Sequence, residues 1–144
     1  MYGIIINILE WLAGIIASLI VVFGTQLIND RYFSPKQELR NLLRKVVYTL
    51  DYYALIIDNP GAVDKETEKE AMYEVRKVAM ELMTFTANYP KMKYKHLSAK
   101  DLESLGPDLV GISNSIGIIN PGYSVYDALQ RIRRIICKEW SDVH

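Results

Sequence analysis

A run of 19 residues without a charge, from Trp11 to Asn29, constrains this chain more than any other feature of its sequence. Isoleucine, leucine, valine and alanine dominate the run. At 1.5 Å per residue, a helix of this length spans about 28 Å, close to the thickness of a bilayer's hydrocarbon core. Glu10 is the only charged residue before Asp30, whereas all 17 lysines and arginines lie at Arg31 or later. The run therefore predicts a single transmembrane helix.

A cleaved signal peptide is the alternative explanation of an apolar N-terminal run. Signal peptides have a basic first segment, a shorter apolar core and a small-x-small exit site. Here the chain begins MYGIIINILE, without a basic residue, and leaves the run as TQLINDRYF, so an uncleaved anchor is favoured.

The basic residues that follow the run predict its orientation. The first of them are Arg31, Lys36, Arg40, Arg44 and Lys45, and none precedes the run. Because basic residues stay on the cytoplasmic side, we expect the N-terminus outside the plasma (inner) membrane and the rest of the chain in the cytoplasm. The predicted domains are a transmembrane helix over residues 1–30 and a cytosolic helical domain over residues 31–144.

Apolar residues at spacings of three and four predict about four helices around one core, an all-α fold. The first helix begins at Pro35, with Ser34 as N-cap, and stops at Asn59-Pro60-Gly61. The second runs from about Lys65 to Asn88. Its predicted inward residues are Met72, Val75, Val78, Ala79, Leu82 and Met83.

The C-terminal third is interrupted by Gly106-Pro107. It predicts a short helix from Ala99 to Leu105 and another from Pro107, because proline disrupts a helix interior. LVGISNSIGII could alternatively be a buried strand, but its two glycines and the lack of a partner strand favour helix. The last helix, capped by Ser124, extends to about Trp140.

Motifs for catalysis and for metal or cofactor binding are missing from the sequence. There is no Walker loop, dinucleotide glycine fingerprint, HExxH or GxSxG. Cys137 is the only cysteine, and His96 and His144 are the only histidines, too few for a disulfide, a zinc site or a catalytic triad. We expect no enzyme activity, no cofactor and no metal.

Polar residues inside an apolar stretch form the first candidate ligand site. Ser113 and Asn114, followed by Ser115, carry neutral donors and acceptors that can read nucleobase edges or sugar hydroxyls. The alternative is structural: Asn114 bridges helices while the serines bond backbone carbonyls.

Positive charge beside tyrosines forms the second candidate site, which includes Tyr94, Lys95, Arg131 and Arg134. Phosphates bind such cations, and bases stack on tyrosine. The alternative is that these charges only solvate a helix face or contact lipid headgroups. Zero net charge disfavours duplex nucleic acid. The predicted ligand residues of both candidate sites are Arg131, Arg134, Ser113, Asn114, Tyr94 and Lys95.

The layout of one N-terminal span, a helical domain opening with FSPKQELR and the later LVGISNSIG resembles small, poorly characterised bacterial membrane proteins. By layout it is also similar to the membrane effectors of prokaryotic antiviral signalling, including type III CRISPR ancillary proteins. That resemblance implies symmetric assembly, a cyclic oligoadenylate bound near the symmetry axis, and spans that rearrange into a leak. The expected function is then an oligomeric membrane effector that senses a cyclic oligonucleotide in antiviral defence.

Two other functions stay open. One is an anchored structural or adaptor protein that docks a protein partner through its surface. The other is a holin-like or toxin-like pore former whose domain controls oligomerisation.

The less apolar residues of the span fall on one face of the helix. They include Asn7, Glu10, Gly14, Ser18 and Thr25. Small residues let helix backbones approach closely, and Asn7 can hydrogen-bond across helices. This face predicts contact between spans in a homo-oligomer, or a pore lining. Glu10 alternatively marks the membrane boundary beside Trp11.

Overall fold

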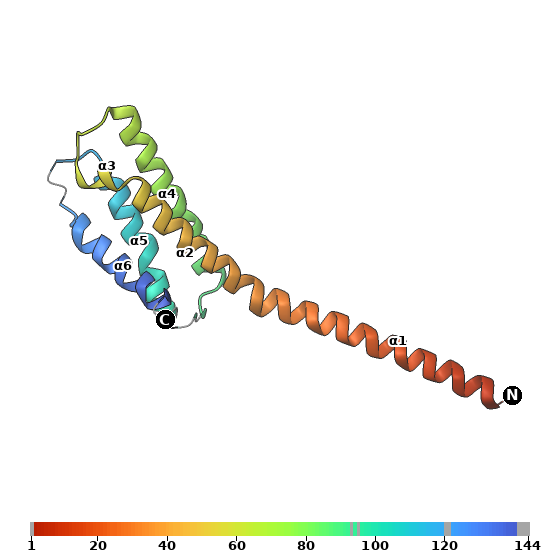
Figure 1. Ribbon diagram of the computed structural model, residues 1–144. Coiled ribbons are helices and arrows are strands. Elements are labelled where there is room, and N and C mark those ends of the chain that lie inside the picture. Colours follow the sequence, from red (N-terminus) through yellow and green to blue (C-terminus); the bar gives the residue numbers. More distant parts are fainter. Residues whose placement is uncertain (1, 93, 95, 120–121, 141–144) are drawn as a thin grey trace. The chain divides into compact units, whose positions relative to one another are not determined.

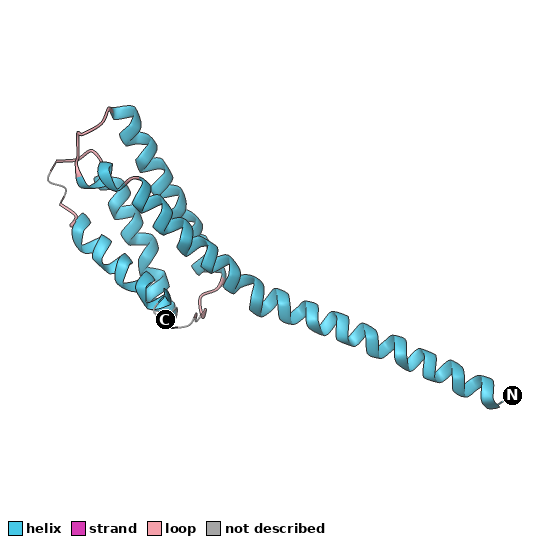
Figure 2. Cartoon of the chain, viewed as in Figure 1, coloured by secondary structure: helices cyan, strands magenta, loops and turns pink. Residues whose placement is uncertain are grey.

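In the part of the chain that the structure describes, every regular element is a helix. The computed structural model describes residues 2–92, 94, 96–119 and 122–140, and for residues 2–10, 32, 139 and 140 the backbone alone. In these ranges the only pairing of extended backbone is an isolated bridge between Tyr94 and Leu97 (Figure 2). The predicted all-α class is confirmed. In chain order the elements are α1 (Tyr2–Ile28), the π-helical turn η1 (Asn29–Phe33), α2 (Ser34–Tyr52), α3 (Ala54–Asp58), α4 (Lys65–Asn88), α5 (Ala99–Ser115) and α6 (Val125–Trp140) (Figure 1).

Two compact units make up the chain, Met1–Glu38 and Leu39–His144, whereas the sequence placed the boundary at residue 30. Most of the first unit is α1, whose large apolar side chains from Trp11 to Ile28 are exposed. In the described ranges, one helix, beginning at Trp11, is long and apolar enough to cross a membrane by length and composition.

The π-helical turn η1 precedes Pro35. The Ser34 N–H donates to the carbonyl of Asn29, five residues back. A proline within a helix presses on the carbonyl four residues earlier, here that of Arg31, and a wider turn relieves this contact. Ser34 has helical angles, φ −59° and ψ −49°. The predicted N-cap at Ser34 is therefore wrong, because Ser34 is itself helical, whereas the start of α2 lies one residue before the predicted start at Pro35.

α2 and α3 together occupy the predicted helix from Pro35 to Asn59, but they are separated at Tyr53. Tyr53 leaves the helical range, with φ −97° and ψ 10°. Its ring is buried, and burial together with the nearby Glu70 carboxylate raises the pKa of its hydroxyl. The predicted end is confirmed, since Gly61 adopts φ +81° in the turn that follows α3.

α4 has the predicted bounds, and Asp64 caps it by accepting hydrogen bonds from the N–H groups of Glu66 and Thr67. Most of the predicted inward residues are buried or half-buried, namely Met72, Val75, Val78, Ala79 and Leu82. Met83 is an exception: it is exposed, and Phe85 is buried instead. The Met83 side chain occupies the space beside Gly106 of α5 that a Cβ would need.

α5 is one helix, so the predicted break at Pro107 is wrong. Ser98 and Asp101 form a capping box that starts the helix: the Ser98 hydroxyl accepts from the Asp101 N–H, and the Asp101 carboxylate accepts from the Ser98 N–H. Pro107 leaves the Glu103 carbonyl without its helical donor, but both residues are exposed, so water can bond that carbonyl. The LVGISNSIGII segment is helical up to Ser115, and Gly117, at φ +75°, turns the chain away.

α6 begins as predicted, since the Ser124 hydroxyl accepts a hydrogen bond from the Asp127 N–H. Its apolar stripe joins the same core as α2, α4 and α5. α5 packs against both α4 and α6, and α6 runs opposite in direction to α2 (Figure 1). The buried residues of α6 are Ala128, Ile132, Ile135 and Ile136.

Candidate functional site: an apolar groove with an acidic rim

Two ion pairs join α5 to α6. Arg131 donates two hydrogen bonds to Asp108, from Nε to Oδ2 at 3.0 Å and from Nη2 to Oδ1 at 2.6 Å. The Lys138 Nζ lies 3.6 Å from Oδ1 of Asp101. Asp101 and Asp108 are two helical turns apart on α5, as Arg131 and Lys138 are on α6, so the two pairs set an antiparallel register.

Tyr123 completes the cluster around Asp108. Its hydroxyl donates to the Asp108 carboxylate at 2.8 Å. Burial and this carboxylate raise the pKa of Tyr123 to about 12, so the phenol is neutral at physiological pH. The ring lies against Gly111 of α5 and fills the space that a Cβ there would need. Asp108 is itself 8% exposed. The cluster of Arg131, Asp108 and Tyr123 therefore holds α5 and α6 together.

The predicted ligand residues are distributed rather than gathered. Arg131 is bound to Asp108. Ser113 is fully buried, and its hydroxyl donates to the Val110 carbonyl at 2.9 Å. Asn114 is exposed and accepts a hydrogen bond from Arg76 of α4.

The remaining predicted ligand residues are Tyr94, Lys95 and Arg134. Tyr94 is buried, and its backbone pairs with that of Leu97. Arg134 is exposed on α6. Lys95 lies outside the described residues. Ser113 and Asn114 thus match the structural alternative that the sequence allowed for them.

A groove lies between α2–α3 and α6 in the second unit. It encloses a cavity of about 170 Å³. Its walls are apolar side chains from both sides: Val47, Leu50, Ala54, Ile57, Leu129, Ile132 and Ile136. A volume of this size admits side chains, not a folded domain.

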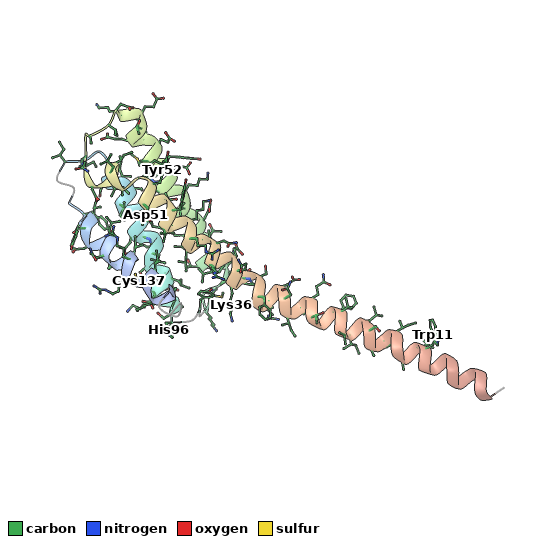
Figure 3. The ribbon with its side chains drawn as sticks, viewed as in Figure 1. Trp11, Lys36, Asp51, Tyr52, His96 and Cys137 are labelled. Atoms are coloured by element: carbon green, nitrogen blue, oxygen red, sulfur yellow. The ribbon has the colours of Figure 1, made fainter. Side chains whose placement is uncertain are left out.

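The rim of the groove carries charge. Asp51 and Asp58 lie on the α2–α3 side, and Arg133 and Cys137 lie on the α6 side. Figure 3 labels Asp51 and Cys137, one on each side. All four are exposed. Within the described ranges, the Asp51, Asp58 and Arg133 side chains have neither an ion-pair nor a hydrogen-bond partner.

Sequence reasoning missed this groove, although a signal was present. The α2–α3 segment has more apolar residues than one packing face needs, because Val47 and Ala54 extend the stripe sideways. Asp51 and Asp58 border that extension at a spacing of seven. An apolar strip bordered by two acids seven residues apart is thus a sequence pattern that indicates such a groove.

The predicted contact face of α1 is described in part. The Ser18 hydroxyl donates to the Gly14 carbonyl at 2.8 Å, and the Thr25 hydroxyl donates to Val21 at 2.7 Å. Both hydroxyls are therefore bonded within their own helix, which lowers the cost of placing them in lipid. The side chains of Asn7 and Glu10 lie outside the described residues.

Among the described residues, no group of three or more histidine, cysteine, aspartate and glutamate side chains is placed to hold a metal ion. No protein-family model matches the chain, and comparisons with curated proteins and with solved structures gave no match.

Proposed function

We propose that this protein is a single-pass membrane adaptor. Its helical domain lies on the cytoplasmic side and holds a protein partner at the membrane. The observation that carries the proposal is the apolar groove between α2–α3 and α6, open on a domain that follows a long, fully exposed apolar helix. No catalytic step and no cofactor belong to this function.

The membrane part of the proposal rests on α1. An isolated helix with exposed isoleucine, leucine and valine is unfavourable in water, whereas lipid covers such a surface. The lysines and arginines all follow this helix, which supports a cytoplasmic domain. Assembly of the spans through Gly14, Ser18 and Thr25 stays a prediction, as does a pore.

The geometry gives the adaptor more support than it gives a sensor of cyclic oligonucleotides. A polyphosphate ligand needs several unpaired cations that converge on it. Asp108 neutralises Arg131, and the groove rim carries two acids for one arginine. Sensing stays a prediction, and calorimetry tests it. If the chain binds cyclic oligoadenylate and the Arg134→Ala variant does not, sensing becomes the better-supported function.

Cys137 allows a direct test of the groove, because it is the only cysteine and lies exposed on the rim. A photoreactive maleimide attached to it is irradiated in native membranes that carry the full chain. We expect one cross-linked polypeptide, identified by mass spectrometry.

Two variants act as a matched pair in this test. Ala54→Trp places a large ring in the groove, and Leu55→Trp adds the same ring at an exposed position that does not line it. The cross-link should disappear in the first variant and persist in the second. A cross-link that both variants retain, or adducts with lipid alone, would overturn the adaptor function.

A further inference from the structure

The groove's rim and walls together restrict which partner it accepts. The α2–α3 side of the groove runs from Val47 to Asp58, with α2 and α3 separated at Tyr53, so the helical rise bounds its length at about 16 Å, roughly three helical turns. The apolar side chains of both walls lie in the space between, and the charged side chains lie at its edges. A partner segment must therefore present an apolar face about three turns long.

The walls favour a helix over an extended strand as that segment. Strand addition needs a sheet edge with free backbone N–H and C=O groups, and helices use those groups internally. An amphipathic helix instead inserts side chains at positions i, i+3 or i+4, and i+7 between two existing helices. Leu50 of α2 and Ile57 of α3 both line this wall, so the inserted side chains would pack against each of them.

The charges at the rim determine which residue types suit the flank of the docked helix. Asp51 and Asp58 are seven residues apart, and both line the groove. Neither carboxylate has a partner among the described residues, so both are available to another molecule. Basic residues along the near flank of a docked helix would face them. Arg133, on the opposite rim, suits an acidic or neutral flank.

A lipid is the competing occupant of an apolar groove. The acyl chain would fit the walls, but two carboxylates at the rim repel the phosphate of an anionic headgroup. Charge complementarity thus favours a cationic protein segment.

We propose that the groove binds an amphipathic helix of a partner protein that carries two lysines or arginines on the flank facing Asp51 and Asp58. This inference rests on the proposed adaptor function and specifies the partner's chemistry.

Three synthetic helices test it. All share one apolar face, and they differ only at two flank positions seven residues apart, occupied by lysine, glutamine or glutamate. Binding to the purified full chain in detergent micelles is followed by fluorescence anisotropy. Two exposed charge pairs, worth up to about 1 kcal/mol each, predict that the lysine peptide binds roughly tenfold more tightly than the glutamine peptide. The preference should shrink as salt rises.

Variants assign the preference to the two carboxylates. Asp51→Asn with Asp58→Asn should abolish it, and Asp51→Lys with Asp58→Lys should invert it toward the glutamate peptide. Glu103→Gln removes an exposed acid of α5 that does not line the groove and should change nothing.

Equal binding of the three peptides overturns the charge inference, while the Cys137 cross-link still decides whether the groove docks a protein. Displacement of all three peptides by a fatty-acid probe, without a charge preference, assigns the groove to lipid and also overturns the inference. A lysine preference that the Asp51 and Asp58 variants remove supports it.

Discussion

Arg131 has a charge that could bind a ligand, but its side chain is paired within the protein and stabilises the fold. Its guanidinium makes a bidentate contact with Asp108, and the Tyr123 hydroxyl donates to the same carboxylate. The sequence suggested a ligand role because cations lie near tyrosines. The pattern along the chain could not reveal Asp108 as the partner, because 23 residues separate it from Arg131 and only the packing of α5 on α6 joins them.

A substitution at Gly111 tests whether the cluster of Arg131, Asp108 and Tyr123 stabilises the fold. In Gly111→Ala the new methyl group meets the Tyr123 ring, which is held by Asp108 and has little freedom to move. Overpacking of this kind costs about 1–3 kcal/mol, so we expect the free energy of unfolding, measured by urea denaturation, to fall by that amount.

Gly122→Ala is the control for this substitution, because no atom lies within 4 Å of the position of its Cβ. Its stability should stay near that of the parent. If both variants unfold at the same urea concentration as the parent, Tyr123 does not hold α5 and α6 together.

The starts of α4 and α6, which depend on local capping, were predicted well from the sequence. α4 begins after Asp64 and α6 after Ser124, because each cap bonds N–H groups within three residues of itself. The two mistakes within helices have a different origin. Tyr53 leaves the helix while its ring is buried and its hydroxyl lies near the Glu70 carboxylate, and Pro107 stays in a helix that packing holds in place. Packing between distant segments is invisible to periodicity.

The capping box of α5 gives a pH-dependent prediction. Hydrogen bonds from the Ser98 N–H and hydroxyl hold the pKa of Asp101 below its ordinary value. A lowered pKa in the folded state means that this stabilisation is complete above about pH 4 and is lost as pH falls through the folded pKa. Asp101→Asn should therefore destabilise the protein at neutral pH and flatten the fall in melting temperature on acidification.

Ser98→Ala removes the other half of the box and should cost about 1 kcal/mol at neutral pH. Asp51→Asn, which deletes an exposed acid without a bonded partner among the described residues, should leave the acid profile unchanged. An Asp101→Asn profile parallel to that of the parent protein would show that the capping box does not cause the acid sensitivity.

At the scale of the whole molecule, the sequence predicted the all-helical fold, which is confirmed, and the long apolar helix that begins the chain. It did not predict the groove. A groove between α2–α3 and α6 depends on the distance between these helices in their common core, and that distance is set by the side chains of the whole core.

Cys137 also reports the orientation of the chain. In intact spheroplasts we expect a membrane-impermeant maleimide to leave Cys137 unlabelled, and to label it after permeabilisation, because the basic residues after α1 favour a cytoplasmic domain. In a Cys137→Ser background, Tyr2→Cys should be labelled from outside. Labelling of Cys137 in intact spheroplasts would reverse the orientation and remove cytoplasmic partners from the proposal.

Recruitment of a helix to a membrane by the groove is the central claim, and liposome flotation measures it directly. The full chain is reconstituted in zwitterionic liposomes, and the fluorescent lysine peptide is added before centrifugation through a density gradient. The peptide should float with proteoliposomes of the parent and of Leu55→Trp, and stay at the bottom with Ala54→Trp. Flotation that Ala54→Trp leaves unchanged, or that protein-free liposomes reproduce, would contradict the claim.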